Sequence, residues 1–184
     1  MRRITRRQLA KLGYIVITVL LTAVIVQAFP EKDPGSGMTS SDTLPVVEVF
    51  DGDTISVRRN GVIEKVRLIG IDTPETKDPR KPVQCFGQEA SRYTHALLDG
   101  RRVRLEIDPS QGERDRYDRL LAYVRRDDGL FINQELVMQG YAHEYTYQSK
   151  PYKYQSEFQS AEASARDQGK GLWSPNTCNG DTSS

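Results

Sequence analysis

Residues 44–75, LPVVEVFDGDTISVRRNGVIEKVRLIGIDTPE, decide the fold. Asn60-Gly61 separates two runs of β-branched residues, and this dipeptide favours the two-residue turn of a β-hairpin. The pattern predicts strands over Leu44–Phe50, Thr54–Arg59 and Val62–Ile71, with an Asp-Gly turn between the first two. The stretch is therefore expected to form three consecutive, hairpin-linked strands.

Downstream of this stretch, apolar periodicity predicts two more strands and three helices. The strands are expected around Val103, Leu105 and Ile107, which alternate with charged residues, and over Leu120–Val124. The helices are expected over Gly87–Leu98, Phe131–Gln139 and Tyr154–Gln168. The order predicts an α+β fold, a five-stranded barrel of the oligonucleotide/oligosaccharide-binding (OB) type with about three packed helices.

The N-terminal segment has the composition of a targeting sequence. Residues 1–13 are basic, and the apolar run Tyr14–Phe29 is short for a membrane span but typical of a signal-peptide core. Val26-Gln27-Ala28 resembles a small-x-small cleavage site. We expect residues 1–28 to be a signal peptide, with retention as an N-terminal membrane anchor as the alternative. The protein is then secreted, or anchored on the outer face of the cytoplasmic membrane.

The composition of the flanking segments sets the domain limits. Residues 29–43 are rich in Pro, Gly, Ser and Thr, which predicts a flexible linker. Residues 44–178 are predicted to form the folded domain, and residues 179–184 a disordered tail. A contact with the membrane is expected only if the N-terminal segment is retained, and we expect a monomer.

The charge balance argues against binding through bulk charge. The net charge of +1 includes five basic residues and no acid within residues 1–28, so the remainder carries 26 − 5 = 21 basic and 25 acidic residues, a net charge of −4. A protein that holds nucleic acid mainly by its overall charge is expected to be basic. Any contact with nucleic acid must therefore come from a local cluster.

Four acidic residues and one arginine form the most informative pattern. Asp51-Gly52-Asp53-Thr54 places two carboxylates beside a turn, and Asp72-Thr73-Pro74-Glu75 places two more after an apolar strand. In a hairpin-linked sheet, Asp53 and Asp72 can lie at one end of neighbouring strands, where their repulsion is costly unless a cation offsets it. Alternation places Arg67 on the strand face opposite Val66 and Leu68. The two cysteines and two histidines fit no zinc motif, so oxygen ligands and a hard cation are favoured.

These motifs closely resemble those of the thermonuclease (staphylococcal-nuclease-like) family, and the resemblance covers roughly Val46 to Ser174. It is carried by the segments VFDGDTI (49–55), VRLIGIDTPET (66–76), GQEAS (87–91), DRLLAY (118–123) and GLW (171–173). It implies that Asp53, Asp72 and the backbone carbonyl of Thr73 bind Ca²⁺, with Asp51 close by. The expected activity is calcium-dependent hydrolysis of phosphodiester bonds in DNA and RNA that leaves 3′-phosphates.

The resemblance also implies roles for the remaining site residues. Arg67 and Arg119 correspond to the two guanidinium groups that hold the scissile phosphate, and Glu75 to the residue that orients or deprotonates the attacking water. The positions expected to bind the flanking substrate are Arg116, Tyr117, Tyr145 and Tyr147. Tyr145 and Tyr147 are expected either to stack on bases or to pack at the domain edge.

Two questions stay open at this stage. Export would place Cys85 and Cys178 in an oxidising compartment, where we expect a disulfide, with two free thiols as the alternative. A non-catalytic module that binds nucleic acid or another partner on the same fold is the alternative to a nuclease. An OB-type oligosaccharide binder is less favoured, because it has no need for paired arginines beside clustered acids.

Overall fold

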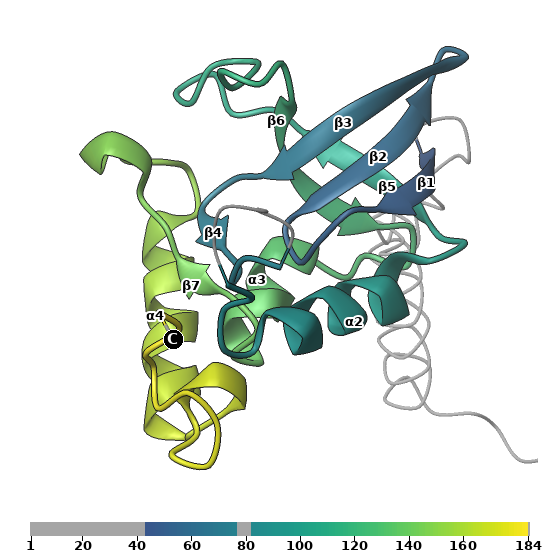
Figure 1. Ribbon diagram of the computed structural model, residues 1–184. Coiled ribbons are helices and arrows are strands. Elements are labelled where there is room, and N and C mark those ends of the chain that lie inside the picture. The colour runs from purple at the N-terminus through teal and green to yellow at the C-terminus, as the bar shows by residue number, and fades with distance from the viewer. Residues whose placement is uncertain (1–42, 77–81, 184) are drawn as a thin grey trace, which may run out of the picture. The chain divides into compact units, whose positions relative to one another are not determined.

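The computed structural model describes residues 43–76 and 82–183, and five of their strands close into a barrel (Figure 1). The barrel strands are β1 (Leu44–Val49), β2 (Thr54–Arg59), β3 (Val62–Leu68), β5 (Arg102–Glu106) and β6 (Leu120–Arg126). They are ordered β1-β2-β3-β6-β5, and every adjacent pair is antiparallel except β3 and β6. This confirms the predicted five-stranded barrel.

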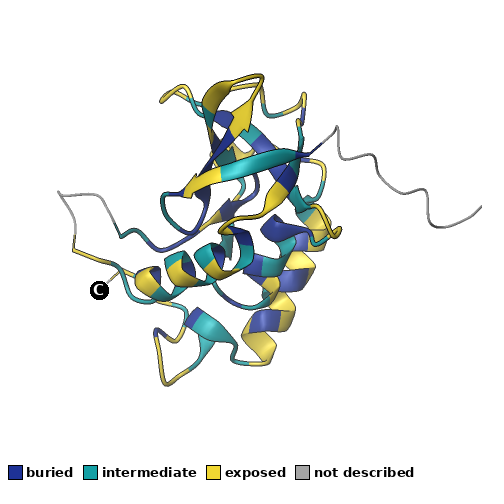
Figure 2. Ribbon diagram, turned by 90° about the vertical axis from the view of Figure 1, so that its right-hand side faces the viewer, coloured by how far each residue is buried: buried dark blue, intermediate teal, exposed yellow. Residues whose placement is uncertain are grey.

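Three α-helices of the described residues pack beside the barrel, as predicted, and Figure 2 shows buried and exposed residues on the different sides of these helices. They are α2 (Gly87–Leu98), α3 (Ile132–Met138) and α4 (Gln155–Asp167), with 3-10 turns η2 (Tyr147–Ser149) and η3 (Gly171–Trp173). The buried side chain of Asn133 ties α3 to the barrel. It accepts a hydrogen bond from the Val124 amide at 2.8 Å and donates one to the Ile69 carbonyl at 2.9 Å. Both polar ends of a buried amide are thereby satisfied.

Apolar side chains at alternate positions of the strands fill the barrel interior. Ile55 and Val57 of β2 and Val66 and Leu68 of β3 are almost completely buried. Arg67, between the two buried residues of β3, therefore projects from the opposite face of the strand. The alternation that builds the core thus also sets the direction of the arginine.

The predicted C-terminal boundary of the third strand is wrong. It was expected over Val62–Ile71, but β3 ends at Leu68, and Gly70 adopts a left-handed φ of 77°. A Cβ atom at Gly70 would lie 2.6 Å from the Tyr152 ring, so the sharp bend requires glycine. Beyond the bend, β4 (Ile71–Asp72) pairs with β7 (His143–Glu144) in a separate two-stranded sheet, which the sequence analysis missed.

The predicted signal peptide or anchor, and the linker up to residue 42, lie outside the described residues. Within residues 43–76 and 82–183, every helix is too short or too polar to span a bilayer.

A disulfide joins Cys85, just before α2, to Cys178, after the last 3-10 turn. The two Cα atoms are 5.9 Å apart. Beyond Cys178, the Gly180 amide donates a hydrogen bond to the Leu172 carbonyl at 2.9 Å. The bridge therefore fastens the C-terminal segment to the start of the first helix.

Removing this disulfide with Cys85→Ser and Cys178→Ser together is expected to destabilise the protein. For a sequence separation of 93 residues, the chain-entropy estimate is at most about 4–5 kcal/mol. Urea unfolding of the variant, beside the wild type with and without reductant, measures the loss. An unchanged midpoint after verified reduction would contradict a stabilising role.

A buried carboxylate, that of Asp108, connects the barrel to the segment before α4. It accepts hydrogen bonds from the Tyr123 hydroxyl at 2.8 Å, the Lys153 amide at 3.0 Å and the Ser110 amide at 2.9 Å. Burial acts to raise the pKa of Asp108, but these hydrogen bonds outweigh it and lower the pKa. The folded state therefore favours the ionised form.

Asp108→Asn is expected to lower the free energy of unfolding at pH 7 by about 1–3 kcal/mol, because it removes charge-assisted hydrogen bonds. A lowered pKa contributes stability that is complete above the unfolded value of about 3.9 and is lost as the pH falls through the folded value. The difference between variant and wild type should therefore shrink below about pH 4. Denaturant melts across this range test it, and a pH-independent difference would refute the linkage.

Candidate active site

One guanidinium group, that of Arg67, joins two acidic side chains from separate parts of the chain. Its Nη1 lies 3.2 Å from Oδ2 of Asp53, just before β2, and its Nη2 lies 2.8 Å from Oδ1 of Asp72 in β4. Nη1 also donates to the carbonyls of Leu68 and Ile71 at 3.0 and 2.9 Å. The arginine therefore bridges the barrel and the small sheet, and it brings the two predicted metal carboxylates to one place.

Asp53 is buried and receives hydrogen bonds at both oxygens. Its Oδ2 accepts from the backbone amide of Thr73 at 2.9 Å and from the Thr73 hydroxyl at 3.1 Å. Its Oδ1 accepts from the hydroxyl of Thr54 at 3.1 Å. Asp53, Asp72 and Thr73, the three predicted metal-binding residues, are therefore close together.

The turn that carries Asp53 fits tightly under Thr73. A Cβ atom at Gly52 would lie 2.6 Å from the Thr73 side chain, a separation that forces one of them to move. The Gly52 carbonyl accepts a hydrogen bond from the hydroxyl of Thr94 in α2 at 2.8 Å. Glycine is therefore needed here for close approach, and α2 holds the turn from the other side.

Crowded carboxylates shift the proton equilibria of this site. Burial, followed by the charge of Asp53, raises the pKa of Asp51 to about 6. Burial by the surrounding protein also raises the pKa of Asp72, against the opposing effect of Arg67. Burial is the largest cause of both shifts, and the charge of Asp53 adds to each. A bound cation would counter both effects, because it favours the ionised carboxylates.

The chemistry of the donors fits a hard divalent cation. Two carboxylates and a backbone carbonyl are oxygen ligands of the kind that Ca²⁺ takes in proteins. Within residues 43–76 and 82–183, no three acidic, histidine or cysteine side chains form a ready metal cage. A cation at Asp53 and Asp72 would therefore need further oxygen ligands, such as backbone carbonyls and solvent.

The guanidinium of Arg119, the residue just before β6, donates two side-chain hydrogen bonds. Its Nε donates to Oδ2 of Asp115 at 2.6 Å, and its Nη1 donates to the Thr54 hydroxyl at 3.2 Å. Burial acts to raise the pKa of Asp115, but hydrogen bonds from Arg119 outweigh it and lower the pKa. Because Thr54 also bonds Asp53, a chain of polar contacts runs from Arg119 through Thr54 and Asp53 to Arg67.

Glu75 lies three residues beyond Asp72, on a segment fixed by Gln84. The Glu75 amide donates to the Gln84 side chain at 2.7 Å, and the Gln84 amide donates to the Glu75 carbonyl at 2.9 Å. The Glu75 carboxylate accepts from the Thr76 amide at 2.8 Å, and its charge helps to raise the pKa of Asp72. Gln84 is adjacent to Cys85, so the disulfide lies beside this segment.

The predicted substrate-binding residues form two separate groups. Tyr117 contacts both Arg116 and Arg119, whose guanidinium carbons lie 4.7 and 5.4 Å from its ring centroid. Tyr145 and Tyr147 follow β7, with ring centroids 6.3 Å apart and both rings exposed. Tyr117 thus lies beside a site arginine, and the Tyr145–Tyr147 pair follows the strand that pairs with Asp72.

Sequence analysis missed three residues that position the site: Thr54, Gln84 and Asp115. Thr54 and Gln84 act through contacts that only the fold creates. Asp115 precedes Arg119 by four residues, but both lie outside the helices, so this spacing gave no helical pairing signal.

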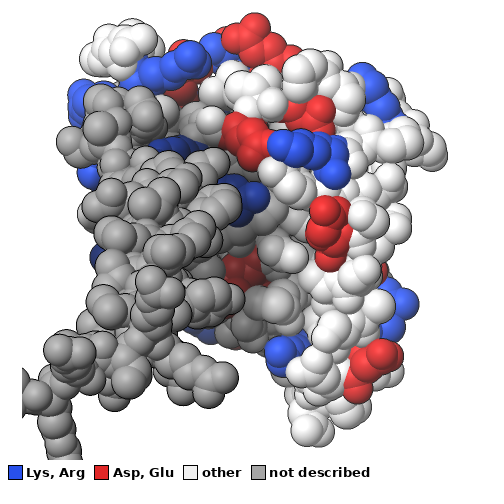
Figure 3. Space-filling view, turned by 180° about the vertical axis from the view of Figure 1, so that it is seen from behind, with Lys and Arg blue, Asp and Glu red and all other residues white. Residues whose placement is uncertain are grey.

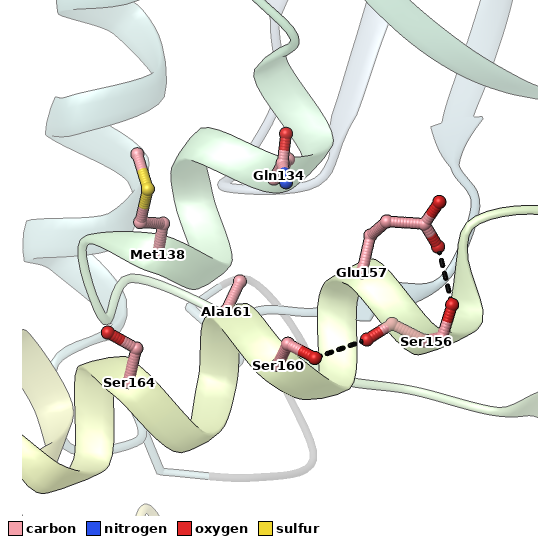
Figure 4. Close-up of a pocket in the computed structure, with 7 residues that line it drawn as sticks. All are labelled: Gln134, Met138, Ser156, Glu157, Ser160, Ala161 and Ser164. Carbon is pink, nitrogen blue, oxygen red and sulfur yellow. Dashed lines mark hydrogen bonds between the residues drawn. The ribbon is translucent and has the colours of Figure 1, made fainter.

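A groove lies between α3 and α4, and none of its lining residues belongs to the candidate site (Figure 4). Its lining is Gln134, Met138, Ser156, Glu157, Ser160, Ala161 and Ser164. No arginine or lysine is among these described residues, so the groove lacks groups suited to holding a phosphate.

Comparisons with known proteins identify the family of this chain. The model of the family "Staphylococcal nuclease homologue" matches residues 65–175. The chain is 38% identical over 166 residues to Thermonuclease of Staphylococcus hyicus, covering 88% of this chain and 96% of that protein. It is 35% identical over 164 residues to Thermonuclease of Staphylococcus intermedius, covering 88% and 95%. It is 40% identical over 127 residues to the SPbeta prophage-derived endonuclease YokF of Bacillus subtilis (strain 168), covering 68% and 42%.

The family match spans more than half of the chain, and the two thermonucleases are covered almost end to end. The chain therefore belongs to the staphylococcal nuclease homologue (thermonuclease) family.

Proposed function

We propose that this chain is a calcium-dependent nuclease that hydrolyses phosphodiester bonds of DNA and RNA and leaves 3′-phosphates. The observation that carries the proposal is the chain of contacts that links Arg119, Thr54, Asp53 and Arg67. It sets two guanidinium groups beside a pair of carboxylates suited to a cation. The relatives named Thermonuclease and endonuclease support the same activity.

The carboxylates of Asp53 and Asp72 and the carbonyl of Thr73 are the ligands that would hold the cation. Calcium, when bound, polarises a phosphoryl oxygen and helps to place a water molecule. Arg67 now neutralises both carboxylates, at 3.2 and 2.8 Å. A bound cation would take over that neutralisation, so the guanidinium would become available to a phosphate.

Arg67 and Arg119 would bind the scissile phosphate and stabilise the charge that develops on it. A guanidinium is planar, stays charged and offers two parallel donors to phosphate oxygens, which a lysine cannot do. Asp115 and Thr54 orient Arg119 before substrate arrives. Such preorganised donors act where charge forms in the transition state.

Glu75 would accept a proton from the attacking water or orient that water. Its backbone is fixed by Gln84 through hydrogen bonds of 2.7 and 2.9 Å. A positioned general base contributes about 10²–10⁴-fold in rate. The Glu75 carboxylate therefore extends from a fixed backbone and can accept a proton.

We also propose that the protein acts outside the cytoplasm. The basic and apolar residues 1–28 and the Cys85–Cys178 disulfide support this proposal, because disulfides persist in oxidising compartments. Cell fractionation tests it, and a protein found only in the cytosol would contradict it.

The activity is tested by hydrolysis of single-stranded DNA with calcium and with chelator. We expect cleavage only with calcium, and a loss of at least about 100-fold in Glu75→Gln and in Arg119→Ala. Glu89→Gln and Arg92→Ala are matched controls, because these residues form an exposed ion pair on α2. Calcium-dependent DNA binding without cleavage would instead identify a non-catalytic binding module.

Gly52→Ala tests whether close packing under Thr73 sets the cation site. The new Cβ, 2.6 Å from the Thr73 side chain, should displace Thr73 from Asp53. We expect calcium affinity to fall about tenfold, since a loss of about 1.4 kcal/mol is that factor. Calorimetry measures the affinity, and thermal melting shows whether the variant stays folded. Unchanged affinity in a folded variant would show that the packing is not required.

A further inference from the structure

The hairpin of β2 and β3 carries three exposed basic side chains that form no ion pair with another described residue. Arg58, Arg59 and Lys65 are exposed, and they take part in none of the ion pairs between described residues. The hairpin's acid, Glu64, is occupied by Arg114 at 2.8 Å. Within residues 43–76 and 82–183, the hairpin therefore presents a local excess of positive charge outside any ion pair.

Strand register places part of this charge on the same face as Arg67. Thr54 pairs with Arg67, and the next pairs toward the tip on that face are Ser56–Lys65 and Arg58–Ile63. Residues two apart on a strand point to the same side and are about 6.8 Å apart. Lys65 and Ile63 therefore continue outward from Arg67, with Arg58 opposite Ile63.

The outer end of this row is open to a ligand. Figure 1 shows β2 and β3 extending as a ribbon from the region of β4 to a free tip. Ile63 is 54% exposed, and the Lys65 ammonium lies 4.5 Å from the Phe50 ring centroid. The row thus combines two cations with apolar surface, which suits a chain of phosphates and bases better than a small anion.

The charge of the rest of the molecule makes this local excess significant. Beyond residue 28 the chain carries 21 basic and 25 acidic residues, a net charge of 21 − 25 = −4. On the face shown in Figure 3, acidic and basic side chains are interspersed. A polyanion must therefore be held by local groups, and the hairpin row begins at the arginine of the candidate site.

We propose that Arg58, Ile63 and Lys65, here called the hairpin track, bind the nucleic-acid chain on one side of the scissile phosphate. The track rests on the proposed nuclease function and extends it, because it favours polymeric substrates over single nucleotides. Lys65 and Arg58 each contact one phosphate of the strand that leaves Arg67, and Ile63 contacts a sugar or base. Glu48 is exposed on the neighbouring strand β1, where it pairs with Ser56. Its negative charge weakens the attraction of the two cations for a phosphate.

The test compares a single-stranded oligonucleotide with a nitrophenyl ester of one nucleotide as substrates of the full chain. In Arg58→Gln/Lys65→Gln, we expect the KM for the oligonucleotide to rise at least about tenfold, with the ester unaffected. The slope of log K against log salt concentration for oligonucleotide binding should become less steep by about 0.7 for each cation removed, or about 1.4 in total. Glu48→Gln should act in the opposite direction, and Arg92→Gln, whose residue is paired with Glu89 on α2, should change neither property.

The proposal is overturned if the double variant keeps the wild-type KM and salt slope on the oligonucleotide. If that result is accompanied by loss of binding to phosphatidylglycerol vesicles, the hairpin tip contacts membranes instead. If the wild type cleaves neither substrate, the nuclease function fails. The salt slope of equilibrium binding, measured with calcium, then still decides whether the track holds nucleic acid.

Discussion

The contact of Arg67 with Asp53 and Asp72 is the interaction on which the site depends. Asp53 lies in the turn before β2 and Asp72 in β4, and the guanidinium offsets the repulsion between their carboxylates. Its hydrogen bonds to the carbonyls of Leu68 and Ile71 also fix the bend where the chain leaves the barrel. The same group therefore joins the barrel to the small sheet and sets the separation of the acids.

The barrel could be predicted because local patterns and the final packing agree. The helix expected over Gly87–Leu98 has those bounds in the structure, and the strands begin within one or two residues of their expected positions. The end of the third strand could not be predicted. Gly70 lies inside an unbroken apolar run, and β4 exists only because a two-residue partner from residue 143 onward reaches it.

The residues proposed as ligands, and Glu75 and Arg67 beside them, could be named from the sequence because they lie in short motifs around Asp53 and Asp72. The residues that orient them were harder to name. Thr54 and Arg119 are 65 residues apart in sequence, and no local pattern indicates that their side chains meet. The sequence predicts a turn at Gly52. The requirement for glycine there comes from the close approach of the Thr73 side chain, which is distant in sequence. Residues whose role depends on contacts with distant parts of the sequence can be identified only from the folded structure.

Calorimetric titration of calcium into the full chain tests whether a cation binds at the carboxylates that Arg67 bridges. One ion should bind per chain, and binding should weaken at least about tenfold in Asp53→Asn and in Asp72→Asn. Nucleotide added with calcium should not restore those variants. Absence of binding to the wild type, or equal affinity in both variants, would contradict the assignment of this site.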